Sequence, residues 1–369
     1  MKESPVTLNE GRAFEVFTAL TRAIAGKEGV FAEVVYPQDR YPMPDEPVAR
    51  ANYLIFASLL MRGPVNSDDP FRWFHSLFER HPDLFDPRQV ARGWTVEKIL
   101  GAFREATQQL LGGNGTGQKG TGVMGYQDEE HARAWIANAN YLVNRWDGNI
   151  LRVFDGVFEF EQAFARVNRQ GSKGEGLIGI RRKIFSLFVI FLQQYQILPD
   201  FPTPIPVDFH ALRVLQGTGV VTLKKMRPCE VTKPEFLAWH EIEMTRIGSN
   251  ITDAIARWSQ WFMVLNGFET RQINPALWVL SRERCANQFQ NRTRGRKETR
   301  QRVGEPIALP QALKEHPSLW PANYDDPCHH CPVEKFCRFI APSSPYYGYG
   351  QLARIERVDC PIPRTDCLF

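Results

Sequence analysis

Three cysteines near the end of the chain have the spacing of metal ligands. They lie in the stretch PCHHCPVEKFC, at Cys328, Cys331 and Cys337. Three thiolates on a tight loop suit either a tetrahedral zinc ion or an iron-sulfur cluster, because both need closely spaced sulfur ligands. The spacing therefore predicts a metal site and leaves the metal open.

The fourth ligand is open as well. The candidates are the two histidines inside the motif and three cysteines outside it, namely His329, His330, Cys285, Cys360 and Cys367. A histidine would complete a Cys3His zinc site. The chain has seven cysteines, and an odd number favours thiolate ligands or free thiols over a disulfide framework.

An aspartate and a lysine upstream are also candidates for chemistry. Asp208 separates the proline-rich PTPIPV from the helical HALRVL, which is typical of a helix N-cap. Lys183 follows Arg181 and Arg182 in LIGIRRKIF, a setting that suits contact with a phosphate. Taken alone, these residues indicate a cap and a basic turn.

Helical spacing dominates the elements that must position these residues. One apolar face comprises Tyr53, Leu54, Phe56, Ala57 and Leu60, and a second comprises Ile251, Ala254, Ile255, Trp258, Phe262 and Leu265. Sustained alternation of the strand type is absent from the sequence, so we expect an all-α chain.

Four segments of irregular composition predict loops, at 37–47, 112–122, 199–207 and 291–302. The glycine-rich second segment does not match a P-loop, because Gln118 stands where that motif has lysine. The fourth is strongly basic and includes Arg292, Arg294, Arg296 and Lys297. It predicts either a DNA-binding arm or a solvated run of charge.

The sequence indicates no membrane association. The N-terminus lacks the apolar region of a signal peptide, and the longest apolar run, residues 184–192, is about half of the roughly 20 residues that a membrane span needs. The net charge of +4 permits a polyanionic partner. We expect a cytoplasmic monomer, either nucleoid-associated or phage-encoded.

The cysteine motif resembles that of the iron-sulfur DNA glycosylases of the helix-hairpin-helix superfamily, the group of endonuclease III and adenine-mismatch glycosylase. Their ligands follow C-x6-C-x2-C-x5-C, and Cys328, Cys331 and Cys337 match the last three. Cys285 ends the segment NPALWVLSRERC, as the first ligand does in the family, but 42 residues separate it from Cys328 where the family has six. Cys360 and Cys367 compete for this place.

Upstream segments resemble the same superfamily in the same order. LIGIRRKIF (177–185) is similar to the hairpin L-P-G-V-G-x-K-T-A, and PVDFHALRVL (206–215) is similar to a V-D-x-H segment. Residues 126–150 and 52–65 resemble the helix before the hairpin and the first helix of the barrel. Gly179 keeps one hairpin glycine, whereas Arg181 replaces the second and Ile178 replaces the proline.

The resemblance implies a role for each matching residue. Asp208 would stabilise positive charge on the deoxyribose, Lys183 would form a Schiff base as in bifunctional members, and His210 would be structural. The DNA contacts would come from the hairpin, two base-flipping wedges and the basic segment: Gly179, Arg181, Arg182, Arg62, Tyr126, Arg292, Arg294, Arg296 and Lys297. A 4Fe-4S cluster, with zinc as the alternative, would bind Cys285, Cys328, Cys331 and Cys337.

The expected fold is therefore an all-α, two-lobed helix-hairpin-helix glycosylase fold with a C-terminal cluster loop. Residues 50–205 would form a helical barrel with the hairpin, and residues 206–345 a cluster lobe with a basic insertion at 286–327. Residues 1–49 would pack on the cluster lobe, and 346–369 would form a tail.

The expected function is DNA base excision by an N-glycosylase, with an AP lyase step through Lys183. One alternative is a phage-type transferase of glycosylase-like fold, which displaces pyrophosphate from a modified thymine with an amine or amino acid. The degenerate hairpin, the long insertion and the tail suit such a divergent enzyme. A non-catalytic DNA-binding protein is the third alternative.

Overall fold

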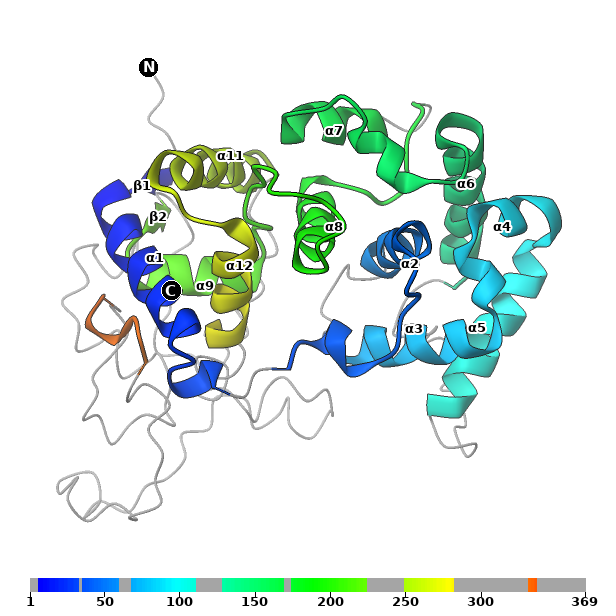
Figure 1. Ribbon diagram of the computed structural model, residues 1–369, viewed down its shortest axis with the longest axis horizontal. Helices are drawn as coiled ribbons and strands as arrows, with labels where there is room; N and C mark the ends of the chain where they lie inside the picture. Colours follow the sequence, from blue (N-terminus) through cyan, green and yellow to red (C-terminus); the bar gives the residue numbers. More distant parts are fainter. Residues whose placement is uncertain are drawn as a thin grey trace, which may run out of the picture. The chain divides into compact units, whose positions relative to one another are not determined.

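The computed structural model describes residues 6–32, 35–59, 68–110, 128–168, 174–223, 249–281 and 331–336. The described chain is mainly α-helical, as expected from its spacing (Figure 1). It divides into two compact units, unit 1 (Met1–Val34 and Pro204–Phe369) and unit 2 (Val35–Thr203).

Unit 2 is a helical body. Its α-helices are α2 (Pro47–Leu59), α3 (Asp68–Arg80), α4 (Pro87–Gly93), α5 (Val96–Leu110), α6 (Asp128–Trp146), α7 (Phe160–Val167) and α8 (Arg182–Gln194). Three short 3-10 helices join them, η2 (Pro37–Arg40), η3 (Pro82–Phe85) and η5 (Ile150–Phe154). Local signals set the start of helix α4. The Asp86 side chain accepts a hydrogen bond from the Arg88 N–H as the N-cap, and Pro87 occupies the first turn.

The core of unit 2 surrounds helix α2. Every residue of α2 from Ala51 to Leu59 is buried, so this part of the helix is enclosed on all sides. It packs against α8, and α3, α5, α4 and α6 pack on one another around it. Phe56 stacks on Trp135 with ring centroids 4.5 Å apart. The predicted face of α2 is correct for its described members, but burial extends around the whole helix.

A second group of aromatic rings supports helices α7 and α8. Phe185 lies 5.3 Å from Phe160 and 5.7 Å from Phe164 between ring centroids, and it stacks nearly parallel to Phe154 at 6.0 Å. Phe185 is fully buried. These contacts fix the start of α8 against α7, because packed aromatic rings have few alternative arrangements.

Unit 1 combines helices with one short strand pair. Its elements are β1 (Val6–Leu8), α1 (Glu10–Ala25), η1 (Gly29–Phe31), α9 (Phe209–Gly217), β2 (Val221–Leu223), α11 (Ser249–Asn266), α12 (Thr270–Val279) and η9 (Glu334–Phe336). β1 and β2 are antiparallel, with Thr7 opposite Thr222. The sequence did not predict this strand pair, and the described chain is mainly helical as expected. Strands of three residues are too short for a visible alternation, and their pairing joins distant parts of the chain.

The two-unit division has different boundaries from the expected domains. Residues 6–32 belong to unit 1, where helix α1 packs against α12, whereas residues 35–49 belong to unit 2. The expected N-terminal extension, 1–49, is therefore shared between the units. The loop at 199–207 has no regular secondary structure, as predicted.

Helix α11 buries a different face from the one predicted. Ile255 and Phe262 are buried as expected, but Leu265 is 63% exposed. Ser259 is fully buried in place of an apolar residue. Its hydroxyl group donates to the Ala256 carbonyl and accepts from the Ile205 N–H, so the polar side chain is satisfied inside the core.

Candidate functional site

The described part of the segment predicted as a hairpin forms a tight turn directly before helix α8. After α7 ends at Val167, the Leu177 N–H donates to the Val167 carbonyl at 2.8 Å. The Ile180 N–H then donates to the Leu177 carbonyl at 3.4 Å, and Gly179 has φ of 88°. A turn with positive φ at its third residue strongly favours glycine there. The local order is thus helix, turn, helix.

Helix α8 begins directly after this turn, and no side chain caps its N-terminus. Its N-cap residue, Arg181, is extended and makes no capping hydrogen bond from its side chain. Arg181 is exposed, and Lys183 is half-buried in the first turn. The first N–H groups of a helix and its dipole attract anions, and the exposed guanidinium group adds charge. The arrangement suits a phosphate group.

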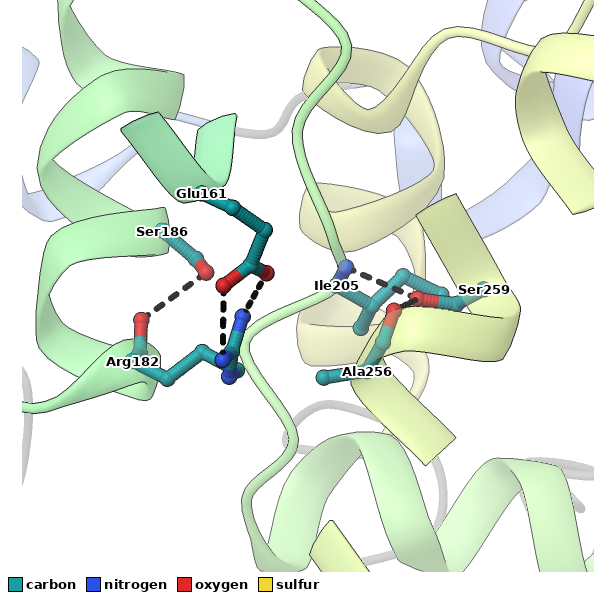
Figure 2. Close-up of polar contacts among 6 residues, drawn as sticks. All are labelled: Glu161, Arg182, Ser186, Ile205, Ala256 and Ser259. Carbon is teal, nitrogen blue, oxygen red and sulfur yellow. Dashed lines mark hydrogen bonds and ion pairs between the residues drawn. The ribbon is translucent and has the colours of Figure 1, made fainter. Parts of the chain in front are cut away.

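Arg182 is held within the fold. Its side chain is 11% exposed and pairs with the carboxylate of Glu161 on α7, with Nη2 2.9 Å from Oε2 and Nη1 on Oε1 (Figure 2). Its guanidinium carbon also lies 5.1 Å from the Phe164 ring centroid. This position argues against the predicted DNA contact for Arg182, because the charged group is already engaged in joining α7 to α8.

A buried asparagine fixes the other side of the turn. Asn138 lies on α6 and is 1% exposed. Its Nδ2 donates to the Ile178 carbonyl at 3.1 Å, and its Oδ1 accepts from the Ile178 N–H at 2.6 Å. Sequence reasoning missed this residue and Glu161. The signal for Asn138 was a polar residue on the apolar face of Trp135, Ala139 and Leu142.

Asp208 is the N-cap of helix α9 in unit 1. Its Oδ1 accepts from the Ala211 N–H at 3.0 Å, and its backbone carbonyl accepts from the Leu212 N–H at 2.9 Å. The side chain is half-buried at the end of a buried run, 203–207. Figure 2 shows the Ile205 N–H of this run directed at the Ser259 hydroxyl group of α11, 3.0 Å away. The carboxylate is therefore held in one place.

His210 contacts two side chains within unit 1. Its Nδ1 lies 3.0 Å from the Ser281 hydroxyl group, and its ring lies edge-on to Trp278 at 6.2 Å between centroids.

The predicted site residues belong to two units. Gly179, Arg181 and Lys183 lie together at the turn of unit 2. Asp208 belongs to unit 1.

Cys331 is the only predicted metal ligand among the described residues. It is half-buried and begins a short segment in which Val333 is buried and the Phe336 ring lies 5.2 Å from the guanidinium carbon of Arg12 on α1. Within the described parts of the chain, no three histidine, cysteine or acidic residues form a group that could hold a metal ion. The other predicted cluster ligands and DNA contacts lie outside the described residues: Cys285, Cys328, Cys337, Arg62, Tyr126, Arg292, Arg294, Arg296 and Lys297.

Unit 2 also contains a cavity of about 390 Å³ that none of the hairpin residues lines. Its charged lining consists of three carboxylates and two guanidinium groups, from Glu46, Asp86, Asp147, Arg88 and Arg152. Arg88 lies 3.0 Å and Arg152 3.5 Å from the Asp147 carboxylate. Because both cations are paired with an acid, this cavity does not favour a phosphate group.

No protein-family model and no curated protein matches the chain. None of the helices in the described ranges is long and apolar enough to cross a membrane.

Proposed function

We propose that the chain is a DNA-binding enzyme of the helix-hairpin-helix glycosylase type, which excises a modified or damaged base as an N-glycosylase. The observation that carries the proposal is the turn between α7 and α8. It combines Gly179 at φ 88° with an N-terminus of α8 that has no side-chain cap and has the exposed Arg181 beside it. Backbone N–H groups at such a turn can hold a DNA phosphate.

In the proposed reaction, the carboxylate of Asp208 stabilises the deoxyribose as the base leaves. When the bond between C1′ and the base breaks, the base leaves with the electron pair and positive charge develops on the deoxyribose. A carboxylate held close by stabilises that charge, more strongly where water is excluded. The N-cap bond from the Ala211 N–H supports this role, because it fixes the carboxylate before the substrate arrives.

Lys183 supplies the lyase step of the proposal. A deprotonated amine would attack C1′ while the bonds from C1′ to the base and to O4′ break, and its two protons would pass to the departing base and to O4′. Elimination of the 3′-phosphate from the resulting Schiff base would then cut the strand. The cysteines would hold a 4Fe-4S cluster, with zinc as the alternative. That cluster would order the segment around Cys331 and take no part in the reaction.

Product analysis tests the proposal and separates it from its alternatives. The chain is incubated with duplex and single-stranded oligonucleotides that carry damaged or modified bases, and the products are identified by mass spectrometry. A released base supports the glycosylase. A heavier nucleoside with an intact glycosidic bond identifies the transferase, and tight binding without product identifies a non-catalytic DNA-binding protein.

Borohydride trapping tests the lyase step separately. Reduction of a Schiff base links the DNA covalently to Lys183, and the adduct should disappear in Lys183→Gln. Base release without any trapped adduct would show a glycosylase that lacks lyase activity.

A further inference from the structure

We propose that Asn138 is a positioning residue, which sets the hairpin turn so that the Gly179 N–H faces the DNA phosphate. This inference rests on the proposed function and names a residue that the family resemblance does not supply. Its basis is the pair of hydrogen bonds between the Asn138 carboxamide and the backbone of Ile178, at 2.6 and 3.1 Å.

The two hydrogen bonds fix two successive peptide groups. The Ile178 N–H belongs to the peptide that joins it to Leu177, and the Ile178 carbonyl belongs to the peptide that joins it to Gly179. In a trans peptide the carbonyl and the N–H point in opposite directions, and no cis peptide occurs among the described residues. Because the Ile178 carbonyl points at Asn138, the Gly179 N–H points away from α6.

Because it points away from α6, the Gly179 N–H would be one of the donors to the phosphate in this proposal. The Gly179 N–H is two residues before the N-cap of α8, so it can join the first N–H groups of that helix around one oxyanion. Glycine at this position also leaves room for close approach of the phosphate. Without the carboxamide, the peptide between Ile178 and Gly179 would lose the contact that selects this orientation.

The residue type at position 178 allows both hydrogen bonds to Asn138. A proline there, as in the resembled hairpin motif, has no N–H group and could make only one of the two hydrogen bonds. With isoleucine, the N–H is present and needs a partner inside the fold. Asn138 supplies that partner. The replacement of proline by isoleucine and the buried asparagine therefore depend on each other.

Asn52 provides a matched control. It is a second buried asparagine of unit 2, 4% exposed, and it makes the same two kinds of bond to a different loop. Its Nδ2 donates to the Gly148 carbonyl at 2.8 Å, and its Oδ1 accepts from the Ile150 N–H at 3.2 Å. Substitution of either asparagine by aspartate keeps the shape and the acceptor, and the ionised carboxylate removes the donor and adds a negative charge. The uncharged variants Asn138→Ser and Asn52→Ser, measured beside them, separate loss of the donor from repulsion of the phosphate.

The test compares Asn138→Asp with Asn52→Asp in the full chain. Hydrogen exchange, measured by mass spectrometry, should become faster at 177–184 in the first variant and around 148–150 in the second. The Kd for a labelled duplex, measured by fluorescence anisotropy, should rise about tenfold in Asn138→Asp and stay within about twofold of wild type in Asn52→Asp. Both variants should show a comparable loss of thermal stability.

The DNA measurement separates positioning from general stability, which both variants lose. Equal changes of Kd in the two variants, or unchanged exchange at 177–184 in Asn138→Asp, would overturn the proposal. If the wild-type chain binds no DNA, the proposed function fails and the phosphate role fails with it, whereas the exchange data still decide whether Asn138 holds the turn. If Asn138→Asp does not fold, Asn138→Ser serves the same comparison with Asn52→Ser.

Discussion

At the scale of single residues, Asp208 combines a structural task with the proposed catalytic one, and the two can be separated. Asparagine caps a helix as well as aspartate does, so Asp208→Asn should keep the bond to the Ala211 N–H. It removes the charge that would stabilise the sugar. We expect unchanged thermal unfolding and a loss of about 100-fold or more in the single-turnover rate of base release.

The control for this variant is Asp208→Ala, which removes the cap as well. It should lower the free energy of unfolding by about 1 kcal/mol, with no further loss of rate beyond that of Asp208→Asn. Full activity in Asp208→Asn would reduce this residue to a helix cap and would remove it from the proposed mechanism.

The adjacent arginines at the start of α8 should respond differently to substitution. Arg181 is exposed beside the turn, whereas Arg182 is paired with Glu161 and 11% exposed. Arg181→Ala should leave stability unchanged and reduce the slope of log Kd against log salt by about one. Anisotropy titrations at several salt concentrations measure this slope.

Arg182→Met should show the reverse pattern. Loss of the pair with Glu161 should lower the free energy of unfolding by about 1–2 kcal/mol, a moderate cost because the carboxylate is partly solvated. The salt slope should stay at the wild-type value. A reduced slope in Arg182→Met with an unchanged slope in Arg181→Ala would exchange the roles assigned to these residues.

At the scale of elements, the turn between α7 and α8 depends on the backbone conformation of Gly179. A φ of 88° is strained for any residue with a Cβ atom. Gly179→Ala should therefore lower stability by about 1 kcal/mol and weaken DNA binding more than Arg181→Ala does, because it disturbs the backbone donors themselves. Thermal unfolding and Kd at one salt concentration measure both effects. Wild-type binding by Gly179→Ala would show that the turn does not contact DNA.

The elements also show where sequence reasoning succeeded and where it could not. Helical spacing identified α2, and the resemblance of LIGIRRKIF to the hairpin motif pointed to the turn, because both signals lie in short stretches of sequence. The partners of that turn, Asn138 and Glu161, are distant in sequence, and only packing reveals that they meet Ile178 and Arg182. The pairing of β1 with β2 escaped for the same reason. Three motif cysteines and the basic segment remain predictions.

At the scale of the whole molecule, two tyrosines of unit 2 should make stability fall at alkaline pH. Burial raises the pKa of Tyr53, and burial followed by the hydrogen bond to Asp39 raises the pKa of Tyr195. Above about pH 10 the unfolded chain releases these protons while the folded chain keeps them. The free energy of unfolding should then decrease by up to about 1.4 kcal/mol per pH unit for each tyrosine.

Phenylalanine variants test this dependence. Tyr53→Phe and Tyr195→Phe should each flatten the decline of the unfolding midpoint above about pH 10. At neutral pH they should differ. Among the described residues the Tyr53 hydroxyl group has no hydrogen-bond partner, so its removal should be neutral or stabilising. Tyr195→Phe loses a 2.6 Å bond to Asp39 and should destabilise. Parallel pH curves for wild type and both variants would contradict the assignment.

The last prediction at this scale concerns the expected metal, which would hold the segment around Cys331. Cys331 leads a segment that contacts α1 through Phe336 and Arg12, so loss of the metal should loosen a contact of unit 1 and not only a surface loop. Protein purified without oxygen should be brown and contain about four iron atoms per chain. One zinc ion in colourless protein would identify a zinc site instead.

Serine variants test which cysteines bind the metal. Cys331→Ser should abolish the iron, and a comparison of Cys285→Ser, Cys360→Ser and Cys367→Ser should identify the fourth ligand. Loss of iron in Cys285→Ser alone would show that the family's ligand order survives the 42-residue separation from Cys328, whereas loss in either C-terminal variant would show that the cluster is completed by the tail.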